Sequence, residues 1–161
     1  MKKWLDSPKC LFASLRVVAV LAILAGVWLS LSCGVVQVVT GTTELTASAV
    51  WYVITALANA GLWVAAWVSF LGMCTRLMQG STAFTQENSR TLRVIGSCVG
   101  LIGAVMCVRA LPGLIVSPDV YLVIEAVILP GTFVTVSAIA FILSRLLDHA
   151  MVLEAEQADV V

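Results

Sequence analysis

Side chains capable of catalysis are few in this sequence, and they form no recognisable catalytic pattern. The chain has one histidine, His149, and its serines and threonines lie in apolar segments without a paired histidine to activate them. The five cysteines include no Cys-x-x-Cys pair of the kind typical of zinc sites, and no glycine-rich phosphate loop is present. We therefore expect no catalytic, metal or cofactor site, and a protein that is not an enzyme.

Three polar residues fall inside long apolar segments and define a candidate intramembrane polar site: Asn59, Arg109 and Glu125. Charge inside a membrane is costly, so such residues are functional candidates by default. An ion pair between Arg109 and Glu125 would account for both, and we expect it to be a structural clamp or a headgroup contact. A small transporter, channel subunit or lipophilic-ligand binder built around Asn59 is the alternative.

The segment between residues 76 and 93 has the pattern of a capped helix start. Thr85 is a good N-cap, because its hydroxyl can accept a hydrogen bond from the backbone N–H of Asn88. Glu87 then stands in the first turn, where the helix dipole favours an anion. A helix start explains most of the pattern, and an interaction loop is the functional alternative. The candidate loop residues are Phe84, Thr85, Glu87, Asn88, Arg90 and Arg93.

The tail after the last apolar segment, residues 148–161, is rich in acidic residues. Besides Asp148, its candidate interaction residues are Leu153, Glu154, Glu156 and Asp159. Such a tail could bind a basic protein surface by charge complementarity. A solvated helix end is an equally good interpretation.

The composition defines the class of protein to which these features belong. Of 161 residues, 61% are hydrophobic and 11% are charged, and the mean hydropathy is +1.07. A soluble domain carries roughly 25% charged and about 45–50% apolar residues, so a soluble domain is excluded. Disorder is excluded by the high hydrophobicity. The net charge of zero disfavours direct nucleic-acid binding, which leaves an integral membrane protein.

Charge-free intervals predict four membrane-spanning helices, since a helix needs about 20 apolar residues to cross a bilayer. The predicted spans are residues 14–36, 48–74, 92–111 and 120–147. The third is short unless Arg109 reaches outward to the membrane edge, as long cationic side chains can. We expect an all-α four-helix bundle in a single membrane domain, followed by the short tail.

Lysine and arginine residues lie almost entirely on one side of the predicted spans. Eight of the nine fall in the N-terminal segment, the 76–93 loop and the start of the tail, and only Arg109 falls on the other side. Because cations favour the cytoplasmic side, we expect a multi-pass inner (plasma) membrane protein with both termini in the cytoplasm. The first span opens with Lys2 and Lys3, as a secretory signal does, but its apolar run exceeds a signal core, so we expect it to be retained.

Small residues recur at helical spacing and predict close helix contacts. They are Ala22, Gly26, Ser30 and Gly34 in the first span, Ala56 and Ala60 near Gly61 in the second, and Gly96, Gly100 and Gly103 in the third. We expect these contacts to be made within one chain, with a second copy as the alternative. Pro130–Gly131 predicts a kink in the fourth span, with the freed backbone groups satisfied by neighbouring groups or by serine and threonine.

Two cysteines, Cys33 and Cys107, fall near the outer ends of their spans. A disulfide between them is one interpretation. We favour the other, in which the cysteines are free thiols that pack as small apolar side chains.

The chain resembles the small four-span bacterial membrane proteins catalogued as domain of unknown function twenty-nine seventy-five. That family has a loop of the form Gly-x-x-Phe-Thr-x-Glu-Asn followed by Leu-Arg-x-Ile-Gly, and it ends in a Leu-x-x-Glu segment with a short acidic, valine-ending tail. The matching residues here are Phe84, Thr85, Glu87, Asn88, Leu92, Arg93, Ile95 and Gly96, then Leu153, Glu156, Asp159 and Val160. Gly80 stands one residue further from Phe84 than the family pattern has it.

Members of that family are often encoded beside a very small helix-turn-helix regulator. The resemblance therefore implies a regulatory membrane protein that sequesters or controls such a transcription regulator. The expected partners are membrane lipid and that regulator. A homo-oligomer of this chain is a further alternative. Two other functions remain alternatives: the transporter or ligand binder described above, and an accessory subunit of a membrane complex that docks through Gly96 and Gly100.

Overall fold

The computed structural model describes residues 8–40, 47–79, 85–116 and 123–158, which are almost entirely helical. The elements are α2 (Pro8–Thr40), α3 (Ala47–Met78), α4 (Gln86–Val116), a π-helical turn η1 (Ile124–Ile128) and α6 (Leu129–Ala158). The long helices have 30 to 33 residues each. At about 1.5 Å per residue, each is longer than the roughly 30 Å hydrocarbon core of a bilayer.

Three helices contain segments that are long and apolar enough to cross a membrane. These are Val50–Met78 in α3, Gln86–Ala110 in α4 and Ala126–Gln157 in η1 and α6, while α2 contributes the shorter apolar segment Ser14–Leu29. Large apolar side chains are exposed along them, and Trp28 of α2 is 74% exposed. A surface of this kind suits lipid and not water. The prediction of an all-helical membrane protein is therefore confirmed.

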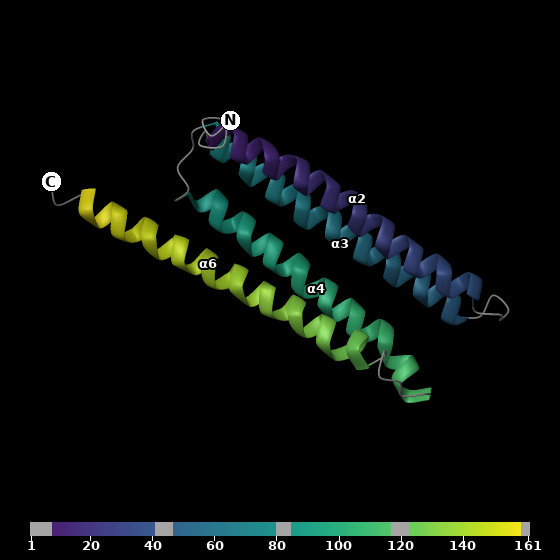
Figure 1. Ribbon diagram of the computed structural model, residues 1–161. Coiled ribbons are helices and arrows are strands. Elements are labelled where there is room, and N and C mark those ends of the chain that lie inside the picture. Colours follow the sequence, from purple (N-terminus) through teal and green to yellow (C-terminus); the bar gives the residue numbers. More distant parts are fainter. Residues whose placement is uncertain (1–7, 41–46, 80–84, 117–122, 159–161) are drawn as a thin grey trace.

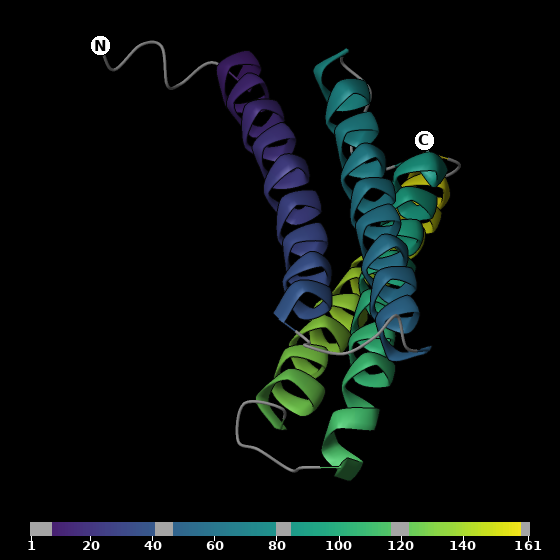
Figure 2. The same ribbon diagram turned by 90° about the vertical axis from the view of Figure 1, so that its right-hand side faces the viewer.

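The four helices pack in chain order. α2 contacts α3, α3 contacts α4, and α4 contacts α6, whereas α2 and α6 make no contact within the described ranges. The result is two hairpins, α2–α3 and α4–α6, joined along α3 and α4 (Figures 1 and 2). The expected four-helix bundle is thus an open array, because the first and last helices do not close it.

Helices α4 and α6 approach closely along the glycines of α4. A Cβ on Gly96 would lie 3.2 Å from the Cβ of Ala140, and one on Gly103 would lie 3.2 Å from the carbonyl oxygen of Pro130. This proximity lets Ser137 Oγ donate a 2.7 Å hydrogen bond to the carbonyl oxygen of Gly96. The prediction that small residues mark contacts within one chain is confirmed for this pair of helices.

The same contact corrects one expectation, that of a docking face for another protein at Gly96 and Gly100. A Cβ on Gly100 would lie 2.9 Å from Ser137 Oγ, and Gly96 is buried. Both glycines are used inside the chain, because α6 occupies the face that they open.

Helices α2 and α3 are held together by a tryptophan placed against a glycine. The Trp63 indole of α3 fills the space where a Cβ on Gly26 would stand. Its Nε1–H donates a 2.9 Å hydrogen bond to the carbonyl oxygen of Ala22, so the buried polar end of the ring is satisfied. Ala22 and Gly26 therefore mark a helix contact as predicted. Ser30 and Gly34 lie outside the described side chains.

The core of the array consists mainly of small side chains. In α3, Ala56 and Ala60 are buried at 3% and 8% exposure, whereas Gly61 beside them faces open space, where an added Cβ would have no neighbouring atom within 4 Å. Other buried alanines are Ala19, Ala66, Ala110, Ala126 and Ala140. Helices in lipid associate by this kind of close backbone approach.

The π-helical turn η1 ends shortly before Pro130, where the sequence predicts a kink. Pro130 has no N–H to donate to the carbonyl of Ala126, four residues earlier, and the N–H of Leu129 bonds to the carbonyl of Ile124. The Ala126 carbonyl oxygen instead accepts a 3.2 Å hydrogen bond from Cys107 Sγ of α4. The prediction that neighbouring groups satisfy the freed backbone is confirmed, with a thiol as the donor.

Candidate functional site

Polar side chains from all four helices gather at the end of the molecule where α3 ends and α4 begins. We call this group the polar cluster. Its members are Arg16 of α2, Thr75 and Arg76 of α3, Glu87, Asn88, Ser89, Thr91 and Arg93 of α4, and Ser144 and Asp148 of α6.

The start of α4 is capped as the sequence predicts. Thr85 Oγ1 accepts a 3.3 Å hydrogen bond from the backbone N–H of Asn88. The Thr85 carbonyl oxygen accepts bonds of 3.1 Å from the N–H groups of Asn88 and Ser89. Glu87 stands exposed in the first turn. Phe84 lies outside the described residues, so its place among the candidate loop residues remains a prediction.

Arg76 in the last turn of α3 joins that helix to the start of α4. Its Nη2 donates a 2.7 Å hydrogen bond to Thr91 Oγ1, and its Nε donates a 3.3 Å bond to Asn88 Oδ1. Its Nε also lies 3.7 Å from a carboxylate oxygen of Glu87, whose side chain is 76% exposed. Such an exposed ion pair adds little, so the hydrogen bonds to Asn88 and Thr91 carry the contact.

Two serines join α4 to α6. The Ser89 and Ser144 hydroxyl oxygens lie 2.9 Å apart, and Ser144 Oγ also donates a 3.1 Å bond to the carbonyl oxygen of Ser89. Both residues are 0% exposed. The sequence analysis did not single out either serine. The available signal was their small size and polarity in otherwise apolar spans, which favours hydrogen bonds between helices.

Two arginines make further contacts between helices. Arg93 Nη2 lies 3.8 Å from Asp148 Oδ2 of α6 and donates a 3.4 Å hydrogen bond to Ser89 Oγ. Arg16 Nη2 of α2 donates a 2.7 Å hydrogen bond to Thr75 Oγ1 of α3. The polar cluster thus connects each helix to the next one along the array.

These contacts divide the predicted loop residues into two groups. Asn88 is 2% exposed and Arg93 contacts α6, so both hold helices together. Glu87 and Arg90 are exposed at the surface, and Arg90 makes no hydrogen bond or ion pair within the described part of the chain. A surface for another molecule at this end can therefore use Glu87 and Arg90 but not the buried Asn88.

The predicted tail is a continuation of α6 and not a separate segment. The last predicted span ends at residue 147, but α6 runs to Ala158 and reaches past the neighbouring helix ends (Figure 1). Val152 and Leu153 are 53% and 49% exposed, and Glu154 and Glu156 are exposed beside them. Asp159 lies outside the described residues. The arrangement is an exposed helix end that offers apolar and acidic side chains together.

Asn59 lies near the middle of α3 and is buried at 8% exposure. Its side-chain oxygen accepts no hydrogen bond from any residue that the structure describes. An apolar cavity of about 210 Å³ between α3 and α4 is lined by Trp51, Ile54, Thr55, Ala58, Ala104, Val105 and Val108. Asn59 is not among the lining residues.

Arg109 lies at the end of the apolar segment Gln86–Ala110. The residue is buried at 8% exposure, and its guanidinium lies 5.8 Å from the centre of the Tyr52 ring of α3. A cation over an aromatic face is stabilised by the ring quadrupole. The side chain of Glu125 lies outside the described residues, so the predicted ion pair with Arg109 remains untested.

Cys107 is a free thiol, as are Cys74 and Cys98. The alternative of a disulfide from Cys33 to Cys107 is therefore not realised, because the Cys107 thiol bonds to the carbonyl of Ala126. Over the ranges that the structure describes, no three histidine, cysteine, aspartate or glutamate side chains come together in a group that could hold a metal ion.

The site and the fold together define an all-helical membrane protein with a polar cluster at one end of the array. Comparison with protein-family profiles, with curated proteins and with solved structures finds no match for this chain. The family resemblance described above therefore remains a prediction.

Proposed function

We propose that this chain is a non-enzymatic, four-span inner-membrane protein that holds a small basic protein at the cytoplasmic end of α6. The observation that carries the proposal is the exposed end of α6. There the apolar side chains of Val152 and Leu153 adjoin the carboxylates of Glu154 and Glu156. Apolar contact area beside complementary charge is what an interface with a basic protein requires.

The distribution of cations supports both the four spans and their orientation. Arg16, Arg76 and Arg93 belong to the polar cluster, and Arg90 and Arg145 are neighbours in sequence of its serines. Five arginines from four helices thus lie at one end of the array, which is the bias expected of a cytoplasmic face. The 33 residues of α2, which packs along α3, are enough for a fourth span.

The family resemblance supplies the candidate partner, a small helix-turn-helix transcription regulator. Such a protein is basic on its DNA-binding surface, which is the charge that the α6 end complements. Holding it at the membrane would keep it from DNA. The membrane protein itself would need no contact with nucleic acid and no catalytic group.

The experiment is membrane fractionation of the regulator encoded beside this chain, co-expressed with the full-length protein. The regulator is expected in the membrane fraction with the wild-type chain. Charge reversal at Glu154→Lys and Glu156→Lys should return most of it to the supernatant. Glu87→Lys separates the α6 end from the loop, because Glu87 is an exposed acid at the same end but outside the α6 extension. Equal release of the regulator by Glu87→Lys would place the contact on the loop and contradict the proposal. A regulator that stays soluble beside the wild-type chain contradicts the proposal.

A second candidate function is a small transporter or lipophilic-ligand binder, which Asn59 supports. Its buried carboxamide oxygen has no hydrogen bond from the described residues, and such a group is expensive unless it serves a ligand or a bound water. Replacing Asn59 with leucine should abolish binding of a lipophilic ligand that donates a hydrogen bond, if this function holds. If instead the variant only becomes more stable, Asn59 has no ligand role.

A further inference from the structure

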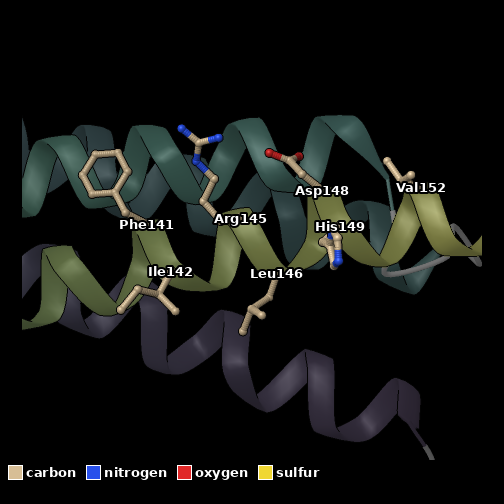
Figure 3. Close-up of a pocket in the computed structure, with 7 residues that line it drawn as sticks. All are labelled: Phe141, Ile142, Arg145, Leu146, Asp148, His149 and Val152. Atoms are coloured by element: carbon tan, nitrogen blue, oxygen red, sulfur yellow. The ribbon is translucent and has the colours of Figure 1, made fainter.

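A groove of about 620 Å³ runs along the outer face of α6 near the polar cluster. It is lined by Phe141, Ile142, Arg145, Leu146, Asp148, His149 and Val152, all from α6 (Figure 3). Within the described residues α6 contacts only α4 and η1, so this face has no helical neighbour. The groove therefore opens to whatever surrounds the protein in the membrane.

One half of the groove is apolar and lies within the membrane-crossing segment. Phe141, Ile142 and Leu146 are 41%, 58% and 59% exposed, and all belong to the span Ala126–Gln157. Figure 3 shows Ile142 and Leu146 on the opposite side of the helix axis from Phe141 and Arg145. Ile142 and Leu146, one turn apart on the same side, form a track along the helix that an extended hydrocarbon chain can follow.

The other half of the groove carries a cation, Arg145, that is available to a ligand. Arg145 is exposed, and it makes no hydrogen bond or ion pair in the part of the chain that the structure describes. The carboxylate of Asp148, also in the groove, lies 3.8 Å from Arg93 Nη2 and is thus already paired. His149 adds a second nitrogen donor one turn beyond Arg145. The charge that remains for an outside ligand is positive.

We propose that this groove binds one anionic phospholipid. The headgroup phosphate lies against Arg145 and His149, and an acyl chain follows Ile142 and Leu146. Cations at the membrane surface attract anionic headgroups, and basic pockets beside spanning helices are where such lipids bind. This inference requires that α6 crosses the membrane, and it does not depend on the partner protein proposed above.

A second copy of the chain fits the groove less well. Copies in one membrane share their orientation, so a symmetric α6–α6 contact would bring the two Arg145 side chains to the same depth and close to the symmetry axis. Like charges at an interface oppose association. The groove's charge therefore favours a phosphate over another copy.

The test is native mass spectrometry of the full-length protein in detergent, with added phosphatidylglycerol or phosphatidylcholine of identical acyl chains. The wild-type protein should retain phosphatidylglycerol in preference to phosphatidylcholine. Arg145→Gln should lower that preference about fivefold, the size expected for one basic residue beside an anionic lipid, and Arg145→Lys should keep most of it. Leu146→Gln should reduce retention of both lipids.

Arg90→Gln is the matched control. Like Arg145, Arg90 is exposed and has no partner among the described residues, and the contact between Ser89 and Ser144 places both arginines at one depth. If Arg90→Gln and Arg145→Gln lower the preference equally, the effect is general attraction to a basic surface and the proposal fails. It also fails if the wild-type protein shows no headgroup preference, or if it forms a dimer that excludes lipid until Arg145 is replaced.

Discussion

The Ser89–Ser144 contact shows how single polar residues organise this molecule. Both hydroxyls are fully buried, and each serine bonds both the hydroxyl and the backbone of the other helix. Lipid offers no hydrogen bonds to compensate a lost partner. The pair therefore fixes the register of α6 on α4, and with it the depth of Arg145 and the point at which the α6 extension begins.

A double-mutant cycle on Ser89→Ala and Ser144→Ala should measure a favourable coupling energy of about 0.6 kcal/mol, and up to roughly 1.7 kcal/mol. The measurement is unfolding in a titration of denaturing detergent, followed by circular dichroism. Thr135→Val is the control, because Thr135 Oγ1 is exposed and bonds only to the carbonyl of Gly131 in its own helix. Zero coupling, or an equal loss in the control, would mean that the serines do not join the helices.

At this scale the sequence predicted local contacts better than distant ones. The Thr85 cap on Asn88 follows from residues three apart, and it is confirmed. The bonds from Arg76 to Thr91 and from Trp63 to Ala22 join residues 15 and 41 apart in sequence, and a single sequence does not say which helix faces join. The contact of Arg109 with the Tyr52 ring was not predicted, because charge and hydropathy alone do not reveal an aromatic ring that can cover a cation.

At the scale of the helices, hydropathy located the spans but not the helix ends. The third span was expected to begin at residue 92, whereas α4 begins at Gln86. The fourth span was expected to end at residue 147, whereas α6 ends at Ala158. Charged residues stop a membrane span, but they do not stop a helix, since glutamate, glutamine and alanine favour helix in water. The helix start was nevertheless predictable from its capping threonine.

The contact of α2 with α3 gives a prediction at this scale. Gly26→Ala should destabilise the protein by about 1–3 kcal/mol, because the new methyl group displaces the Trp63 indole. Gly61→Ala should be neutral or stabilise by up to about 1 kcal/mol, because the space there is open and alanine is the better helix former. Tryptophan fluorescence during detergent unfolding reports both. A Gly26→Ala protein as stable as the wild type would show that Trp63 does not pack on Gly26.

The whole molecule is an open array of two hairpins, and Arg76 lies at their junction. Its hydrogen bonds to Asn88 and Thr91 are the polar contacts described between α3 and α4 at this end. No helix other than α3 connects the first hairpin to the second among the described residues. The relative position of the hairpins therefore depends on one helix–helix interface.

Co-expressed halves of the chain, divided within residues 80–84, should therefore associate and purify together. Arg76→Gln should weaken this association about fivefold, the equivalent of about 1 kcal/mol for hydrogen bonds of a charged group that is partly exposed to solvent. Recovery of an affinity-tagged half with its untagged partner is the measurement. Arg90→Gln should leave recovery unchanged. If the halves fail to associate even without substitution, the α3–α4 interface is too weak to hold the hairpins.

Packing in chain order has a consequence for how the protein is made. Each helix emerging from the ribosome finds its neighbour already inserted, so no contact has to wait for a later part of the chain. A molecule whose last helix had to reach the first would expose that first helix until synthesis ended. Here the Trp63 contact can form before α6 has been translated, and insertion and folding can proceed as a single directional process.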